Sequence, residues 1–187
     1  MKKNRWKVIS YYTPDYTEVA ERLEQSLQRL HLPYELFPLP DTHNWYLNTE
    51  LKAYVVQAML ETQPYDVVFL DADAEVLYYP ELFDTIDCDI AAHIYRGVEF
   101  LSGTLFFKNN DIGRKIAREW ILLNNAARTE PRDLEQRRLG LVIEDMKPKF
   151  FNLPQEYCYI FDTPFTCAHP CIVHYQHSRK TRRKGLR

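Results

Sequence analysis

Residues 65–76 decide the fold of this chain, and they read Tyr65-Asp66-Val67-Val68-Phe69-Leu70-Asp71-Ala72-Asp73-Ala74-Glu75-Val76. The run up to Leu70 is rich in β-branched and aromatic residues and lacks the polar alternation of a half-exposed strand. It therefore predicts a fully buried strand. Asp71 and Asp73 follow at its carboxyl end, which is where ligands bind in an open α/β sheet.

The two carboxylates of this stretch indicate a metal site. Held close together, Asp71 and Asp73 repel each other unless a positive group lies between them. A divalent, oxygen-seeking cation such as Mg²⁺ or Mn²⁺ meets that need, with a phosphorylated substrate completing its coordination shell. The alternative is a strand that ends in a solvated acidic turn, because short acidic tripeptides are common.

Length and composition indicate one ordinary globular domain. The chain has 187 residues, of which 45% are apolar and 27% charged, enough for a single core. The net charge of −2 gives no global attraction to nucleic acid or to a membrane. The first residues are too polar for a signal peptide, and no apolar run approaches the ~20 residues of a membrane span. The four cysteines are too irregularly spaced for a disulfide framework, so we expect a cytoplasmic protein.

Strand and helix patterns alternate in the first half of the chain. Strands are expected at 8–12, 34–39 and 65–70, with helices at 16–30 and about 48–61 between them. The second helix is expected to carry its apolar face on Leu51, Tyr54, Val55, Ala58 and Met59. This β-α-β-α-β order predicts a parallel sheet with right-handed crossovers.

The second half is less regular. We expect short or full helices at 80–86, 112–125 and 134–146, strands at 89–94, 100–108, 149–153 and 172–175, and a long packed loop at 154–171. No repeat or linker interrupts the pattern, so residues 1–177 form one domain, and residues 178–187 form a tail. The tail holds six Lys or Arg residues and no acid.

Four motifs, in this order along the chain, make the sequence resemble the nucleotide-sugar glycosyltransferases of the A-type fold, particularly those related to glycogenin and the bacterial galactosyl- and glucosyltransferases of lipopolysaccharide. They are Phe69-Leu70-Asp71-Ala72-Asp73-Ala74-Glu75-Val76, Leu101-Ser102-Gly103-Thr104-Leu105-Phe106-Phe107, Asp133-Leu134-Glu135-Gln136-Arg137-Arg138-Leu139 and His174-Tyr175-Gln176-His177-Ser178-Arg179-Lys180. They are similar to the family's Asp-x-Asp strand end, its Ser-Gly turn, its acidic-Gln helix start and its terminal H-x-x-G-x-x-K-P-W. The chain departs from the last motif at His177, Thr181 and Arg182, where the family has Gly, Pro and Trp.

This resemblance implies a single-domain, Rossmann-like α/β fold of the A type, with a mostly parallel central sheet flanked by helices. It implies metal-dependent transfer of a sugar from a nucleoside diphosphate donor, a UDP-hexose by family habit, with retention of configuration. The implied cofactor is Mn²⁺ or Mg²⁺, held by Asp71, Asp73 and His174. For His174, capping of a short terminal strand is the alternative. The resemblance does not identify the acceptor.

By the same resemblance, the donor-binding residues are Tyr12, Thr13, Tyr16, Lys52, Asp71, Ala72, Ser102, Gly103 and Lys180. The tyrosines and Thr13 would hold the base, although turn chemistry and core packing explain them equally well. Lys52 would lie near the donor; the alternative is that it belongs to a solvated helix face. Gly103 would let the backbone approach the sugar. Lys180 would contact the diphosphate as the tail closes over the donor. An electrostatic contact with nucleic acid is the other use of such a tail.

The catalytic candidates are Asp133, Glu135 and Gln136. Inverting transfer needs a general base beside the acceptor hydroxyl, whereas retaining transfer needs a polar group on the opposite face of the sugar. A solvated, charged helix face is the alternative for these residues.

Three readings from other classes remain open. Residues 70–76 are also similar to the first motif of the haloacid-dehalogenase-type phosphatases, in which the first Asp is the nucleophile and the second an acid or base. Cys167, Cys171, His174 and His177 could form a zinc site, although their spacing is tighter than in familiar zinc modules. The donor features could also belong to a nucleotide-sugar binder without activity.

Overall fold

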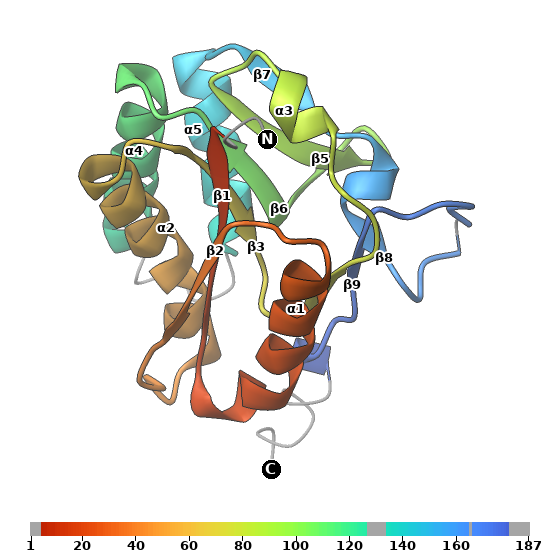
Figure 1. Ribbon diagram of the computed structural model, residues 1–187. Helices are drawn as coiled ribbons and strands as arrows, with labels where there is room; N and C mark the ends of the chain where they lie inside the picture. The colour runs from red at the N-terminus through yellow and green to blue at the C-terminus, as the bar shows by residue number, and fades with distance from the viewer. Residues whose placement is uncertain (1–4, 127–133, 165, 180–187) are drawn as a thin grey trace.

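A computed structural model describes residues 5–126, 134–164 and 166–179. Its main feature is a central six-stranded sheet with the strand order β2-β1-β3-β6-β5-β7 (Figure 1). The strands are β1 (Trp6–Tyr12), β2 (Tyr34–Pro38), β3 (Asp66–Leu70), β5 (Ile90–Tyr95), β6 (Glu99–Phe107) and β7 (Phe150–Asn152). β6 runs antiparallel to both of its neighbours, and the remaining pairs are parallel. The expected mostly parallel α/β sheet is therefore confirmed.

Helices cover both faces of this sheet. α2 (Trp45–Thr62), α4 (Asp111–Ala126) and α5 (Glu135–Met146) lie on one face, while α1 (Thr17–Arg29) and the short α3 (Leu82–Thr85) lie on the other (Figure 1). β3 contributes to the core on both sides. Val67 and Phe69 join the cluster under α2, α4 and α5, whereas Val68 and Leu70 join the cluster under α1. Burial on both faces explains why this strand is uniformly apolar.

A small second sheet, with the order β4-β9-β8, lies beside the end of β3. It is formed by β4 (Ala74–Val76), β9 (Ile172–His174) and β8 (Tyr159–Ile160). The sequence predicted β9 but not β4 or β8. β8 lies in the segment 154–171, which we expected to be a loop. Two short 3-10 helices, η1 (Pro14–Tyr16) and η2 (Gln155–Tyr157), complete the described elements. Such short elements depend on tertiary pairing rather than on local pattern.

The apolar face predicted for α2 is correct only in part, because Met59 is buried and Val55 packs against the core, whereas Tyr54 is exposed. The helix begins at Trp45, where the Asn44 side chain accepts hydrogen bonds from the backbone N–H groups of Tyr46 and Leu47. Its buried side chains are Glu50, Lys52, Ala53, Val56, Met59 and Leu60, whereas Tyr54 from the predicted apolar face is 38% exposed. Two of the buried residues are charged, so hydrophobicity alone could not identify this face.

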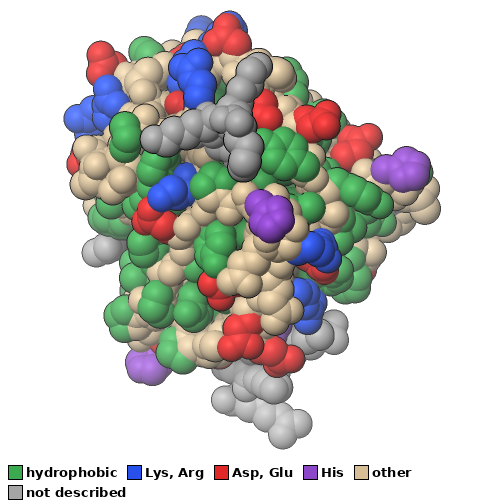
Figure 2. Space-filling view, viewed as in Figure 1, with side chains coloured by type: hydrophobic (Ala, Val, Ile, Leu, Met, Phe, Trp, Pro, Cys, Tyr) green, Lys and Arg blue, Asp and Glu red, His purple; other side chains and the backbone are tan. Residues whose placement is uncertain are grey.

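The distribution of surface charge and the state of the cysteines match what the composition predicted. Figure 2 shows acidic and basic side chains interspersed over the face that carries α1. All four cysteines are free thiols. Within the described ranges, no helix combines the length and apolarity needed to cross a membrane.

Candidate functional site: an acidic cluster in a large cavity

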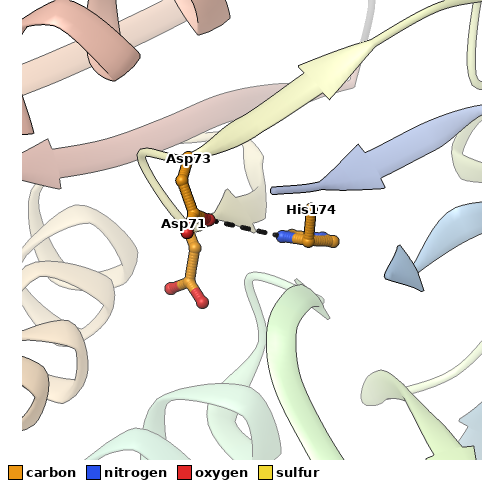
Figure 3. A group of neighbouring side chains, drawn as sticks. All are labelled: Asp71, Asp73 and His174. Atoms are coloured by element: carbon orange, nitrogen blue, oxygen red, sulfur yellow. Dashed lines mark ion pairs between the residues drawn. The ribbon is translucent and has the colours of Figure 1, made fainter. Parts of the chain in front are cut away.

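Asp71, Asp73 and His174 come together although a hundred residues separate the acids from the histidine. One ligand atom from each lies within 4.8 Å of the others, and in the part of the chain that the structure describes no further group of three or more such side chains meets this test. Figure 3 shows the carboxylate of Asp73 turned toward the imidazole, with Asp71 beside it. The predicted ligand set is thus assembled by the fold.

Strand pairing places His174 in this cluster. β4 and β9 pair antiparallel with Ala74 opposite His174, and the backbone N–H of Tyr175 donates to the carbonyl of Asp73 at 3.2 Å. His174 is 2% exposed. Its Nε2 lies 2.8 Å from Thr104 Oγ1, and its Nδ1 lies 3.9 Å from Asp73 Oδ1. When Nε2 carries the proton and donates to Thr104, Nδ1 presents its lone pair to the acids.

The electrostatics of the three side chains are linked. Burial would lower the pKa of His174, but the neighbouring Cys158 and Asp73 raise it to about 10. Burial would raise the pKa of Asp73, but the nearby imidazole of His174 and the hydrogen bond from the backbone N–H of His177 hold it below its usual range. Burial and the charge of Asp73 raise the pKa of Asp71 against the opposing effect of Lys52. The positive charge that the two acids need is supplied in this structure by the imidazole of His174 and the ammonium of Lys52.

Lys52 lies at the base of the site. Its Nζ lies 2.9 Å from Asp71 Oδ1 and 3.0 Å from Glu135 Oε1, and it donates to the carbonyl and hydroxyl oxygens of Ser102 at 3.1 and 3.0 Å. Burial would lower its pKa, but Asp71 and Glu135 hold that pKa above its ordinary value. The lysine side chain is only 4% exposed, so its alternative as part of a solvated helix face is wrong.

Gly103, in β6 of the central sheet, lies directly against the acidic cluster. A Cβ atom at this position would lie 3.0 Å from His174 Cε1 and 3.4 Å from Asp71 Oδ2. The backbone carbonyl of Gly103 accepts a hydrogen bond from the N–H of Asp71 at 2.9 Å. The glycine is therefore required for close approach and not for a special backbone angle.

A cavity of about 1190 Å³ connects the cluster to the remaining predicted residues. Its walls include Tyr12, Thr13, Tyr16, Lys52, Asp71, Ala72, Asp73, Ser102, Gly103, Glu135, Gln136 and His174. The fold thus gathers every predicted site residue that the structure describes. Asp133 and Lys180 lie outside the described residues, so their predicted roles stay predictions.

The carboxyl-terminal motif contacts the loop after β1. The ring of Tyr16 packs edge-on against His177 with their centroids 4.8 Å apart. The backbone N–H of His177 donates to Asp73 Oδ2 at 2.7 Å. His177 occupies the position at which the resembled family has glycine, and here its ring packs against Tyr16, which lines the cavity.

The two described catalytic candidates differ in their surroundings. Glu135 is 5% exposed; it accepts a hydrogen bond from the hydroxyl of Ser102 at 2.7 Å as well as from Lys52. A solvated helix face is therefore wrong for Glu135. Gln136 lines the cavity, and its side-chain contact with a described residue is a long one, 3.5 Å, to Glu99. The carboxylate of Glu135 holds Lys52 in position, whereas the side-chain amide of Gln136 is held less tightly by its neighbours.

Sequence analysis missed several residues of the site. Thr104 orients His174, Cys158 lies beside the same imidazole, and Trp45 and Tyr46 line the cavity. Thr104 had a usable signal, because it is a polar residue directly before the apolar run that ends β6. Cys158 had none, since it lies in the segment expected to be an irregular loop.

The alternative zinc set is not assembled. Cys171 Sγ lies 3.3 Å from the carbonyl oxygen of Tyr78, while His174 belongs to the acidic cluster. Among residues 5–126, 134–164 and 166–179, the two cysteines and two histidines do not form a common ligand group. The tight spacing in the sequence does not produce a metal centre here.

Known structures share this fold. The chain superposes on the crystal structure of the glycosyltransferase GlyE in Streptococcus pneumoniae TIGR4 with a TM-score of 0.67 and 18% identity, over 90% of this chain and 54% of that one. For the apo form of GlyE the TM-score is 0.69, again at 18% identity, over 92% of this chain and 54% of that one. This chain thus spans about half the length of those proteins. No protein-family model and no curated protein matches the sequence. At this level of identity the likeness establishes the fold alone.

Proposed function

We propose that the protein is a metal-dependent glycosyltransferase that uses a nucleoside diphosphate sugar, a UDP-hexose, as its donor. The observation that carries this proposal is the convergence of Asp71, Asp73 and His174 at the carboxyl end of β3, inside a cavity of about 1190 Å³. The glycosyltransferase fold and the resemblance to the glycogenin and lipopolysaccharide glycosyltransferases support the same conclusion.

The residues fit the implied cation. Two carboxylates and one imidazole nitrogen suit Mn²⁺ or Mg²⁺, with open positions left for phosphate oxygens. The hydrogen bond between Thr104 and His174 Nε2 orients the ring so that Nδ1 faces Asp73, which is the usual way that a protein prepares a histidine ligand. Such a cation would neutralise charge on the departing diphosphate.

The neighbouring side chains supply binding and positioning. Lys52 holds Asp71 in place and is itself held by Glu135 and Ser102. Tyr12, Thr13 and Tyr16 form the wall on which the base would lie, and His177 supports Tyr16 from the carboxyl-terminal motif. Arg179 lines the cavity and pairs with Asp162; on donor binding it would exchange this partner for phosphate oxygens. Lys180, next to it, is proposed for the same task.

For retention of configuration, Gln136 is the better-placed polar group. Glu135 is committed to Lys52 and Ser102, whereas Gln136 borders the cavity, and its side-chain contact with a described residue is a long one, to Glu99. We therefore assign to Gln136 the face of the sugar opposite the leaving group, and to Glu135 the positioning of Lys52.

Calorimetric titration with UDP tests this function, with and without Mn²⁺, on the wild type and on Asp73→Asn. We expect binding that requires Mn²⁺ and that is lost in the variant, because one ligand is removed from the set. Asp111→Asn is the matched control, since the side chain of Asp111 is 97% exposed in the first turn of α4. UDP affinity that is the same without metal, or the same in Asp73→Asn, would refute the assignment. Hydrolysis of a phosphomonoester without UDP binding would favour the phosphatase alternative.

A further inference from the structure

A second hollow lies on the helical layer that α4 and α5 form, apart from the acidic cluster. It is a groove of about 580 Å³ between the two helices, and its walls include Lys115, Glu119, Leu122 and Leu141. The groove and the donor cavity share no described lining residue. It is therefore a feature that the proposed function does not use.

Exposed apolar side chains gather on this helix pair. Leu122 is 59% exposed, Leu141 is 44% exposed, and Ile112, in the first turn of α4, is 42% exposed. Single apolar side chains are common on protein surfaces, whereas a group of them marks a contact site. Covering these three side chains with a partner would remove apolar area from water and so favour association.

The outer face of α4 has a spacing that is the same in both directions along the helix. Ile112, Lys115, Glu119 and Leu122 follow one another at intervals of three, four and three residues, which places them on one helical face. Glu119 is half-buried and the other three are exposed. If two copies of α4 met antiparallel, Ile112 of each copy would lie opposite Leu122 of the other. Lys115 of each copy would lie opposite Glu119 of the other.

The charges on this face are complementary to themselves. Within the part of the chain that the structure describes, the side chains of Lys115 and Glu119 take part in no hydrogen bond or ion pair. A twofold contact uses the same patch on both copies, so each pairing occurs twice. Two Lys115–Glu119 pairs would lie beside the axis, with the apolar pairs outside them. A parallel contact in register would instead oppose Lys115 to Lys115 and Glu119 to Glu119, which like charges disfavour.

We propose that the protein associates with a second copy of itself through an antiparallel contact of α4 with α4, centred between Lys115 and Glu119. Leu141, on α5, borders the same groove and would extend the apolar part of the contact. The inference goes beyond the proposed function and does not depend on it, because the contact uses a different surface.

Sedimentation velocity of the full chain tests the association. We would measure the sedimentation coefficient from about 1 μM to about 200 μM, the range in which a contact of modest area dissociates. We expect a monomer–dimer equilibrium. Leu122→Asp should weaken it at least about tenfold, because the variant replaces an apolar contact by a charge at two positions of the dimer. A wild type that stays monomeric at every concentration would overturn the inference.

Charge reversal tests the geometry of the contact. At low ionic strength, Lys115→Glu and Glu119→Lys should each weaken the dimer at least about tenfold, since each opposes like charges at two positions. The double variant Lys115→Glu with Glu119→Lys restores both pairs and should associate within about threefold of the wild type. Glu21→Lys is the matched control, because Glu21 is an exposed residue of α1, on the other face of the sheet; it should associate as the wild type does. A double variant as weak as the single ones, or a dimer that none of these changes affects, would overturn the proposed contact.

Discussion

At the scale of single residues, the site depends on how closely Gly103 approaches His174. His174 has little freedom, because Thr104 holds one ring nitrogen and Asp73 faces the other. A side chain at position 103 would press on the imidazole and on Asp71 together. The proposed metal ligands are therefore positioned by a residue that donates no ligand atom.

Gly103→Ala should lower the affinity for Mn²⁺ by about 10–100-fold, as loss of a ligand-orienting contact does in other metal sites. The new Cβ would lie 3.0 Å from His174 Cε1, so the imidazole must shift by a few tenths of an ångström from its position beside Asp73. Mn²⁺ titration by calorimetry measures the effect. Gly140→Ala is the control: its Cβ would meet Phe100 at 3.6 Å or more, and in a helix it should stabilise the fold by about 1 kcal/mol. Unchanged Mn²⁺ affinity in Gly103→Ala would show that His174 is not held as described.

At the scale of elements, two ion pairs join α2 to α5. Lys52 pairs with Glu135, and Glu50 pairs with Arg138 at 2.6 Å, with both side chains of the second pair under 10% exposed. The indole N–H of Trp120, on α4, also donates to the carbonyl of Glu135 at 2.8 Å. The second ion pair thus fixes the relative position of the two helices that carry the first one.

Arg138→Ala should lower the free energy of unfolding by about 3–5 kcal/mol, because it leaves Glu50 buried without its partner. The double variant Glu50→Leu with Arg138→Leu should recover most of that loss. Arg138 Nε makes no hydrogen bond in the structure, and a buried pair that is incompletely satisfied can be replaced by apolar groups at little cost. Urea unfolding of the three proteins measures both effects. A double variant as unstable as Arg138→Ala would contradict this account of the pair.

The same elements show what sequence can predict here. The apolar run of β3 and the helical periodicity of α1 and α4 were sufficient, because a buried strand and an amphipathic helix leave regular patterns. The face of α2 was predicted only in part, since Glu50 and Lys52 are buried by partners far along the chain. The ligand set was predicted from a resembled motif, but its assembly depends on the pairing of β4 with β9, and a three-residue strand leaves no local pattern.

At the scale of the whole molecule, the core divides into two apolar clusters on opposite faces of the sheet. The sheet lies between these clusters and holds Asp71 and Asp73 just beyond the carboxyl end of β3. Cys88 and Cys171 are both buried in the cluster under α1. Cys167, by contrast, is partly exposed in the segment before β9. Thiol chemistry therefore reports on the integrity of the fold around the site.

In the native protein at pH 8, Ellman's reagent should react rapidly with one thiol, Cys167. Burial raises the pKa of Cys88 to about 12 and that of Cys171 to about 11. Because reaction needs the thiolate, only about one molecule in 10³ to 10⁴ would be reactive at these positions even without the protection of the core. Cys158 is 3% exposed and should be shielded. Cys167→Ser should remove the fast phase, and urea should expose the remaining thiols. A fast phase that persists in Cys167→Ser would contradict the packing around the other cysteines.

The central claim is that a divalent cation bound by Asp71, Asp73 and His174 organises a nucleotide-sugar site. It is tested most directly by crystals grown with UDP and Mn²⁺ and measured for anomalous scattering from manganese. We expect one strong manganese peak bound by the three side chains, with the diphosphate of UDP completing its shell and the base against Tyr12 or Tyr16. Manganese elsewhere, or UDP bound away from Asp71 and Asp73, would contradict it.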